Sequence, residues 1–308
     1  MKNALMQPRY LVLLAAYNGM EWIAEQVSSI LNQEGVSVKL LISVDSSTDG
    51  TECWVADLAE LDPRVEFLAH GVKFGGAARN FFRLIKDAPA EGYHYVAFAD
   101  QDDIWSTQKL IHAADVLSTA CADGYSGNVT AFWPDGKECL IVKSQPQVKY
   151  DHLFEAAGPG CTYVFTKTLF SQLKQHIIDG YSEVQCVTLH DWYCYAFSRS
   201  QGYKWVIDDN SYMRYRQHSN NQVGVNSGLK AFRTRLLKVF DGWWLNQAAL
   251  ISKLTGVENT PFVQSWISLR RVDLIRLAFS GYKCRRRVRD KILFTVLCVV
   301  LAILRQKK

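Results

Sequence analysis

Apolar runs of strand length alternate with stretches of helical periodicity through the first hundred residues. The apolar runs cover residues 10–16 (YLVLLAA), 39–44 (KLLISV), 65–68 and 93–99 (YHYVAFA). In the stretches between them, apolar residues recur every three or four positions, which places them on one face of a helix. Continuous apolar runs are typical of strands buried on both faces, so the alternation predicts a mostly parallel sheet with helices on both faces.

The pattern changes after Trp105. Beyond it we expect helices over 108–117 and 190–199, strands over 129–133, 139–142, 161–166, 203–207 and 212–215, and mainly helix from 229 onward. Pro134, Asp135 and Gly136 are typical of a hairpin turn between the first two of these strands. The pattern therefore predicts an α/β domain over residues 8–225, followed by a helical region over 226–308.

Polar clusters follow the apolar runs at the points where the predicted strands end. Tyr17 and Asn18 follow the first strand, Asp45 follows the second, and residues 100–103 (DQDD) follow the fourth. Asn18 is also a candidate N-cap for the first helix. In parallel sheets covered by helices, the ligand site lies beyond the carboxyl ends of the strands, so we expect these clusters to share one site.

The acidic cluster is the strongest candidate for chemistry. Asp100, Asp102 and Asp103 repel one another unless they are solvated or bound to a cation. Mg²⁺ and Mn²⁺ take oxygen ligands and often share them with substrate phosphates. An acidic surface loop is the alternative, but the buried strand before the cluster and the apolar Ile104 and Trp105 after it favour a site.

Motifs of the common nucleotide-binding folds are missing from the chain. It has neither a Gly-x-x-x-x-Gly-Lys-Ser/Thr loop nor a Gly-x-Gly-x-x-Gly sequence after a strand. Gly75 and Gly76, just before Arg79, could still bring the backbone and a guanidinium close to a ligand phosphate. Ordinary phosphate-loop and dinucleotide-binding classes are therefore excluded.

The distribution of charge and the cysteines limit the class of binding partner and the cellular compartment that we expect. Residues 284–308 carry eight Lys and Arg against Asp290 alone, a net +7, so the other residues sum to −2 of the total +5. A body without excess positive charge is not that of a nucleic-acid-binding protein. The eight cysteines form no Cys-x-x-Cys pair and most have apolar neighbours, which predicts reduced thiols in the cytoplasm. Residues 1–9 are polar and do not resemble a signal peptide.

The C-terminal residues 292–304 are almost wholly apolar, with basic clusters on both sides. The run is shorter than the roughly 20 residues that cross a bilayer. It predicts a helix lying in an anionic membrane surface, where Lys and Arg reach lipid phosphates. The alternative is a helix packed on the body of the protein.

Six segments in order resemble one enzyme family. They are LLAAYNGMEWIAEQVSSILNQ, ISVDSSTDGT, FGGAARNFF, FADQDDIW, LHDWY and YRQHSNN, within about residues 13–221. The chain resembles the inverting glycosyltransferases of the GT-A fold that use nucleotide-sugar donors, and most of all their rhamnosyltransferase-like members. One departure is Val44-Asp45-Ser46-Ser47, where the commoner pattern is Asp-Asp-Gly-Ser; it affects the expected details of base recognition.

The resemblance implies a role for each matching position. The donor-binding residues would be Ala16, Tyr17, Asn18, Asp45, Arg79, Asp100, Gln101 and His218. Among them, Asp45 would contact the base and Asp100 the ribose. Asp102 would hold Mg²⁺ or Mn²⁺ on the diphosphate, with His218 as a further candidate ligand. Asp191 would be the catalytic base.

This inventory suits a single displacement with inversion. A metal ion stabilises the departing diphosphate, so one carboxylate is enough to remove the proton of the acceptor hydroxyl. A glycosidase would instead need two carboxylates flanking one bond. Asp191 taken alone could equally be an acid that stabilises a helix N-terminus.

The resemblance thus implies a nucleotide-sugar-binding half over 8–105 and an acceptor half over 106–225. Its donor would be a dTDP- or UDP-sugar, with dTDP-rhamnose first. The acceptor would be a glycan or glycolipid of a lipid-linked surface polysaccharide, reached from the cytoplasmic face of the membrane. Two other functions remain open at this point: a metal-dependent nucleotide-sugar hydrolase and a non-catalytic nucleotide-sugar-binding protein.

Overall fold

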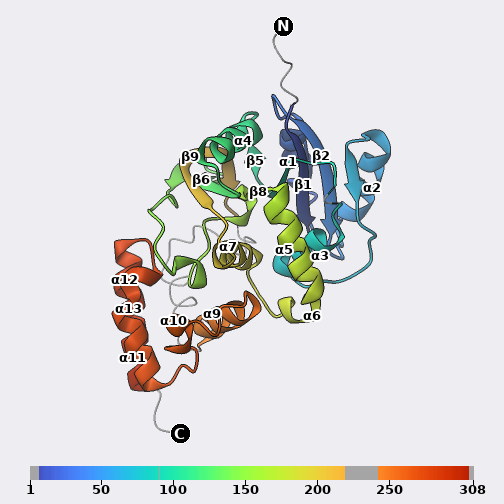
Figure 1. Cartoon of the computed structure of the whole chain (residues 1–308). Coiled ribbons are helices and arrows are strands. Elements are labelled where there is room, and N and C mark those ends of the chain that lie inside the picture. The colour runs from blue at the N-terminus through green and yellow to red at the C-terminus, as the bar shows by residue number, and fades with distance from the viewer. Residues whose placement is uncertain (1–6, 90, 219–241, 305–308) are drawn as a thin grey trace. The chain divides into compact units, whose positions relative to one another are not determined.

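The computed structural model describes residues 7–89, 91–218 and 242–304 (Figure 1). The chain forms two compact units. Unit 1 consists of residues 1–144, 158–191 and 203–222, and unit 2 of residues 145–157, 192–202 and 223–308. Unit 2 thus takes two segments from the predicted acceptor half, and the division at residue 225 stays a prediction.

The first four strands of unit 1 follow the predicted pattern. They are β1 (Arg9–Ala16), β2 (Ser37–Val44), β3 (Val65–Phe67) and β4 (Tyr95–Asp100), in the spatial order β3-β2-β1-β4. All three pairings among them are parallel. The register sets Ala16 beside Val44 and Ala15 beside Asp100. The polar residues that follow these strands therefore emerge at one edge of the sheet, as predicted.

The later strands make the sheet mixed. From β4 the order continues through β8 (Val164–Thr166), β6 (Gly124–Phe132), β9 (Trp205–Arg216) and β5 (Ile104–Trp105), while β7 (Glu138–Ile141) pairs with β6. The β6–β9 pair is parallel, but β4–β8, β6–β8, β6–β7 and β5–β9 are antiparallel. The α/β class is confirmed, and the parallel arrangement holds for the first four strands.

Two strand predictions in this half need correction. The strands predicted over 203–207 and 212–215 are one strand, β9, which begins at Trp205 and whose pairing with β6 continues past register shifts between Gly127 and Thr130. The strand predicted from residue 161 begins at Val164, because Gly160–Thr162 forms the short 3₁₀ helix η2. The predicted hairpin is confirmed as β6–β7, and the turn residue Gly136 has φ +82°.

Helices complete unit 1. They are α1 (Ile23–Leu31), α2 (Thr51–Leu61), α3 (Ala77–Asp87), α4 (Lys109–Ala120), α5 (Lys167–Asp179) and α6 (Tyr181–Val184). None of the patterns above predicts α5, although the signal is present. Thr166 caps it by accepting a hydrogen bond from the amide of Leu169, and the buried Leu169, Phe170, Leu173 and Ile177 recur at helical spacing.

Unit 2 is helical where the structure describes it. Its elements are η1 (Asp151–Leu153), α7 (His190–Ser200, whose first two residues belong to unit 1), α9 (Trp243–Leu254), α10 (Pro261–Gln264), α11 (Arg271–Phe279), α12 (Gly281–Cys284) and α13 (Val288–Leu304). No described helix is both long and apolar enough to cross a bilayer. All eight cysteines are free thiols.

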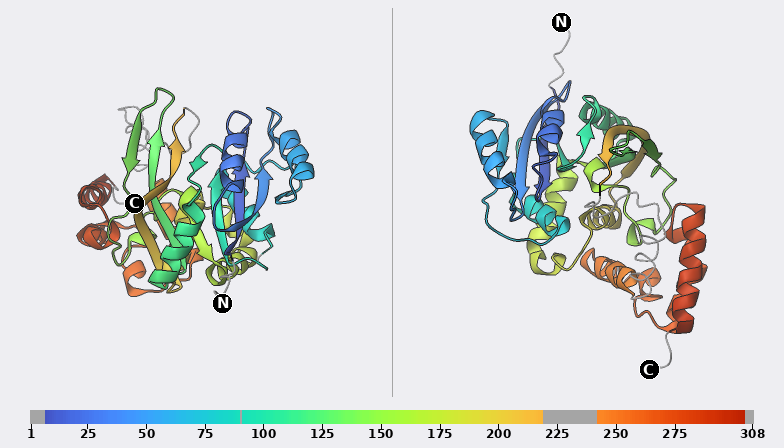
Figure 2. Two further views of the ribbon diagram at one scale, coloured as in Figure 1. Left: turned by 90° about the horizontal axis from the view of Figure 1, so that it is seen from above. Right: turned by 180° about the vertical axis from the view of Figure 1, so that it is seen from behind.

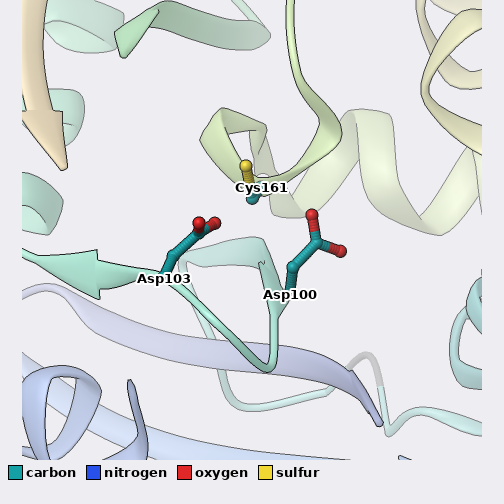
Figure 3. A group of neighbouring side chains, drawn as sticks. All are labelled: Asp100, Asp103 and Cys161. Atoms are coloured by element: carbon teal, nitrogen blue, oxygen red, sulfur yellow. The ribbon is translucent and has the colours of Figure 1, made fainter. Parts of the chain in front are cut away.

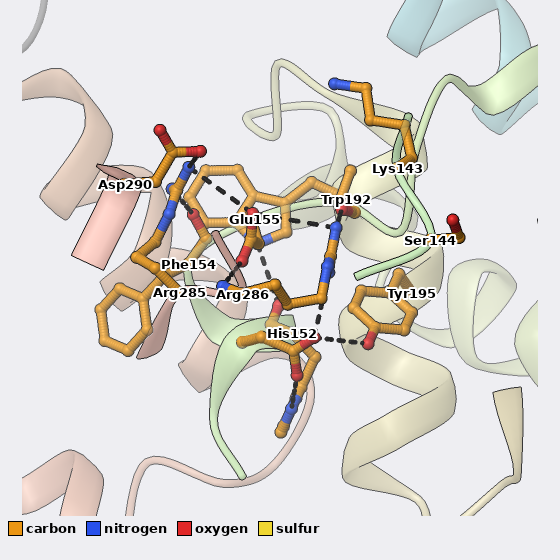
Figure 4. Close-up of polar contacts among 12 residues, drawn as sticks. Lys143, Ser144, His152, Phe154, Glu155, Trp192, Tyr195, Arg285, Arg286 and Asp290 are labelled. Atoms are coloured by element: carbon orange, nitrogen blue, oxygen red, sulfur yellow. Dashed lines mark hydrogen bonds and ion pairs between the residues drawn. The ribbon is translucent and has the colours of Figure 1, made fainter. Parts of the chain in front are cut away.

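A buried ion-pair network holds unit 2 together (Figure 4). The guanidinium of Arg286 lies 3.0 Å from the carboxylate of Asp151, and it also donates to the carbonyl of Ala156 at 2.7 Å. Asp151 is fully buried and accepts a second hydrogen bond from the Tyr195 hydroxyl at 2.9 Å. The backbone amide of Arg286 donates to Glu155 at 2.7 Å. This network joins the segment after α12 to η1 and α7.

Candidate active site

The end of β1 is joined to the acidic loop by one side chain. The Gln101 side-chain amide accepts from the backbone N–H of Tyr17 at 2.7 Å and donates to the Tyr17 carbonyl at 2.8 Å. A Cβ at Gly19 would lie 2.5 Å from the side-chain oxygen of Gln101, so the close approach needs a glycine there. The Tyr17 side chain itself is 54% exposed and is available to a ligand.

Asn18 joins the same region to the loop between β2 and α2. Its side-chain oxygen accepts from the backbone N–H of Thr48 at 2.9 Å, and its own N–H donates to the Ser47 hydroxyl at 3.0 Å. The N-cap prediction for Asn18 is wrong, because α1 begins at Ile23 and Trp22 occupies the cap position. Asn18 has a positive φ of 43°, which its short polar side chain tolerates.

Asp45 is buried and holds the loop before α3. Its carboxylate accepts from the backbone N–H groups of Ser46, Phe74 and Gly75 at 2.8–2.9 Å. Its own amide donates to the carbonyl of Ala16, itself a buried residue. These bonds place the predicted nucleotide-binding residues of β1 and β2 side by side.

Arg79 lies on α3 and is exposed, and the carbonyls of Gln185 and Phe74 accept from its guanidinium at 3.3 and 3.4 Å. Both hydrogen bonds are long. The guanidinium would therefore give up only weak hydrogen bonds if it turned toward a phosphate.

The acidic loop forms a compact cluster with a thiol (Figure 3). One oxygen each from Asp100 and Asp103 and the sulfur of Cys161 lie within 4.8 Å of one another. Asp103 is fully buried: one of its oxygens accepts from the Arg216 backbone at 3.2 Å, while the other has no hydrogen-bond partner in the described structure. An orphaned buried carboxylate oxygen fits a site that receives a cation.

Burial and like charges act together on this cluster. Burial raises the pKa of Asp100 to about 7, and the negative charges of Asp102 and Asp191 act in the same direction. Burial also raises the pKa of Asp103 well above its usual value. The Cys161 pKa is raised in the same way, so the thiol stays neutral and is a poor ligand for Mg²⁺ or Mn²⁺. The oxygens of this loop suit those ions, and the sulfur does not.

A buried lysine, which the sequence patterns do not single out, lies beneath the cluster. Lys109 donates to the Cys161 carbonyl at 3.1 Å, and its ammonium lies 3.4 Å from the centre of the Trp105 ring. Burial lowers its pKa to about 7, although nearby Cys161 and Asp103 favour the charged form. Lys109 therefore holds η2 in place through the Cys161 carbonyl. When it is protonated, its ammonium also stabilises the charged form of the nearby Asp103.

Asp102 points to another partner. Its carboxylate lies 2.7 Å from a ring nitrogen of His218, and the His218 ring stacks on Trp22 with centroids 4.1 Å apart. Arg216 reinforces this contact, because its side chain donates to the Asp102 carbonyl at 2.8 Å. The two residues proposed to hold a metal are thus in contact, although they are 116 positions apart in the chain.

Asp191 lies in the first turn of α7, next to η2. A Cβ at Gly160 would come within 3.2 Å of the Asp191 Cβ and 2.7 Å of a ring nitrogen of His190. His190 stacks on Phe81 with centroids 3.9 Å apart, and burial lowers its pKa to about 3, so its ring is neutral. Gly160 is followed by Cys161 of the acidic cluster, and the charge of Asp191 reaches Asp100. Asp191 and the acidic loop therefore share one site.

The structure gathers these positions around the carboxyl ends of β1, β2 and β4. Comparison with known proteins identifies the family to which the chain belongs. Residues 11–171 match the model of the family described as Glycosyl transferase family 2. The "dTDP-rhamnosyl transferase RfbG" of Shigella flexneri is 41% identical over 291 residues, which covers 94% of this chain and the whole of that protein. The chain belongs to glycosyl transferase family 2.

Other members match this glycosyltransferase less fully. The "UDP-Glc:alpha-D-GlcNAc-diphosphoundecaprenol beta-1,3-glucosyltransferase WfgD" of Escherichia coli is 28% identical over 162 residues, or 52% of this chain and 61% of that protein. Among solved structures, TarS 1–349 of S. aureus aligns over 96% of this chain and 81% of its own, with a TM-score of 0.56 and 12% identity. The structural likeness confirms the GT-A fold expected from the sequence.

Proposed function

We propose that this glycosyltransferase moves rhamnose from dTDP-rhamnose to a hydroxyl group of a growing surface polysaccharide. The observation that carries the proposal is the match of 41% identity along the whole length of a relative named as a dTDP-rhamnosyl transferase. The exposed Tyr17 and the backbone at the ends of β1 and β2 supply a surface for the nucleotide. The acceptor would be lipid-linked, as the name of the glucosyltransferase WfgD says of its own acceptor.

Asp191 is the proposed base of a single displacement with inversion. It approaches the acidic loop from a different element, α7, and its charge acts on Asp100. Deprotonation of the incoming acceptor hydroxyl requires one carboxylate that does not bind the diphosphate. Such a base contributes about 10²–10⁴-fold in rate. The sugar carbon would be attacked from the Asp191 side while the diphosphate leaves toward the acidic loop.

Asp102 and His218 are the proposed holders of Mg²⁺ or Mn²⁺. Their hydrogen bond of 2.7 Å supports the proposal, because it holds a carboxylate and an imidazole together at the acidic loop, where an ion would take the place of the shared proton. When bound, the ion would neutralise charge on the leaving diphosphate. Asp100, in the same loop as Asp102, would contact the ribose. Arg79 would turn from its two long hydrogen bonds on α3 to contact the phosphates.

The test is transfer by the purified full-length protein from radiolabelled dTDP-rhamnose, with UDP-glucose and UDP-N-acetylglucosamine as competing donors. We expect dTDP-rhamnose to be used, transfer to stop in a chelator and to return with Mn²⁺, and the product anomer to be opposite to the donor anomer. Asp191→Asn should lower kcat at least about 100-fold while dTDP still raises the melting temperature. Asp57→Asn, on the surface of α2, is the matched control.

The same assay separates the other two functions. A hydrolase would consume dTDP-rhamnose equally well without acceptor, and a binding protein would show the melting shift with no turnover on any acceptor. Full activity of the Asp191→Asn variant would refute the proposed mechanism, and preference for a UDP-sugar would refute the proposed donor.

A further inference from the structure

Helix α13 carries a continuous apolar stripe on its exposed side. Val288, Ile292, Val296, Val299 and Ile303 follow one another at intervals of three or four residues, and each is between 41% and 72% exposed. A helix of a water-soluble protein normally turns such a stripe toward the core. Here the stripe extends along almost the whole 17-residue helix, which is about 25 Å.

The opposite side of α13 is already packed. Phe294, Cys298 and Leu301 are buried, and α11 and α13 lie side by side, as the end-on view in Figure 2 shows. The Arg271 side chain donates to the carbonyls of residues 302 and 303 at 3.0 Å, so α11 satisfies the end of α13. The helix is therefore fixed through one face, and the apolar stripe is its outer face.

The neighbouring helices extend the apolar surface. Phe279 at the end of α11 is 80% exposed and Tyr282 on α12 is 60% exposed. Both line a shallow groove together with Lys291, Ile292 and Val296 of α13. The exposed apolar side chains of the three helices therefore form one continuous patch, which we call the α11–α13 face.

The charges around the α11–α13 face are mainly positive. Residues 270–304 contain nine Lys and Arg against two Asp, and both acids are engaged within the protein. Asp273 is buried and bonded to Arg270 at 2.9 Å, and Asp290 is bonded to Arg289 at 2.9 Å. Arg285 and Arg286 also pair with acids outside this range, Glu155 and Asp151, so nine cations meet four acids and the excess positive charge is five. The face thus offers apolar side chains in its middle and an excess of positive charge around them.

An anionic bilayer surface matches both features. Aliphatic side chains are stabilised among the acyl chains just below the headgroups, while Lys and Arg reach the phosphates above them. Basic residues next to such a surface are attracted by its negative potential. A second copy of the chain would bring the same positive charges together, so self-association through this face is disfavoured electrostatically.

We propose that the α11–α13 face docks the enzyme on an anionic phospholipid surface, with α13 lying in the plane of the interface. Only the purpose of this docking rests on the proposed function: docking would bring the enzyme to the membrane that carries a lipid-linked acceptor. Docking itself needs neither donor nor acceptor, so it can be measured separately.

The experiment is flotation of the full-length protein with vesicles of phosphatidylcholine alone or with about one third phosphatidylglycerol. We expect binding only to the anionic vesicles, and weaker binding at high salt. The double variant Ile292→Ser with Val296→Ser should bind at least about tenfold more weakly, because it removes apolar side chains from the centre of the face. Leu61→Ser, at an apolar residue of α2 that is 82% exposed, is the matched control.

Three results would overturn the inference: no binding of the wild-type protein to anionic vesicles, undiminished binding of the double variant, or a dimer in solution that the double variant turns into a monomer without a change in vesicle binding. The effect of dTDP on the melting temperature is measured on the same samples. Loss of that effect with intact vesicle binding would count against the proposed function and leave the docking face standing.

Discussion

Replacing Asp100 with asparagine should stabilise the protein, and the gain should grow as the pH rises. Burial, followed by the charges of Asp102 and Asp191, holds the pKa of Asp100 at about 7 in the folded protein, against 3.8 for the ordinary side chain. Between these values the folded state binds more protons than the unfolded state, so stability falls as the pH rises toward 7. Asparagine carries no charge at any of these pH values and removes this loss.

The magnitude follows from the same numbers. One unit of difference in pKa corresponds to about 1.4 kcal/mol, so a pKa of about 7 in place of 3.8 sets an upper limit of about 4 kcal/mol. The advantage of Asp100→Asn over the wild-type protein should therefore increase by between about 1 and 4 kcal/mol from about pH 4 to pH 8. Below pH 4 the carboxyl is protonated in both states, and no pH-dependent advantage remains.

Urea unfolding at several pH values, in the presence of a chelator, measures this difference. Asp62→Asn is the matched control. Hydrogen bonds from Arg64 lower the pKa of Asp62, so its stabilising effect is gained below about pH 4 and is complete above it, and the difference between that variant and the wild-type protein should stay nearly constant from pH 4 to pH 8. If the difference between Asp100→Asn and the wild-type protein stayed constant within about 0.5 kcal/mol from pH 4 to pH 8, the electrostatic description of the acidic loop would be wrong.

Three further substitutions test other parts of the structure. Gly160→Ala should lower kcat at least about tenfold with unchanged dTDP binding, because its Cβ would displace Asp191; normal turnover in steady-state assays would contradict this placement. Gln101→Ala should weaken dTDP binding about tenfold in calorimetry by freeing the end of β1, whereas an unchanged Kd would show that the clamp is not needed. Arg286→Met should cost about 3–5 kcal/mol in urea unfolding, since it leaves the buried Asp151 with only the more distant Arg199, at 3.5 Å, as an ion-pair partner; a loss below about 1 kcal/mol would mean that the pair contributes little.

Local patterns were sufficient where strands are buried on both faces. Residues 10–16 and 39–44 are continuous apolar runs, and each became a strand within two residues of the predicted bounds. Because parallel strands end at the same edge, the positions of Asp45 and Asp100 followed from their place after a strand. The Tyr17–Gln101 clamp joins two of these edge loops, but its hydrogen bonds depend on side-chain geometry that no spacing reveals.

Contacts between distant segments were beyond such patterns. The pairing of Asp102 with His218 depends on β5 running beside β9, and β5 has only two residues. Cys161 reaches the acidic loop because β8 pairs with β4, and a strand of three residues leaves too weak a pattern to predict that register. The resemblance assigned Asp102 and His218 to metal binding, but these contacts are determined by sheet topology and became visible only in three dimensions.

The burial of Arg286 has a practical consequence for shortening the chain. Cutting before α13 to remove its apolar surface would retain the arginine, but any cut before residue 286 would remove the ion-pair partner nearest to the buried Asp151 carboxylate. Asp151 lies 135 residues upstream, in η1, and the adjoining Glu155 and Ala156 also bond to Arg286. A truncated protein that lacks Arg286 should therefore misfold around residues 151–156, and a failure to transfer sugar would then say nothing about membrane docking.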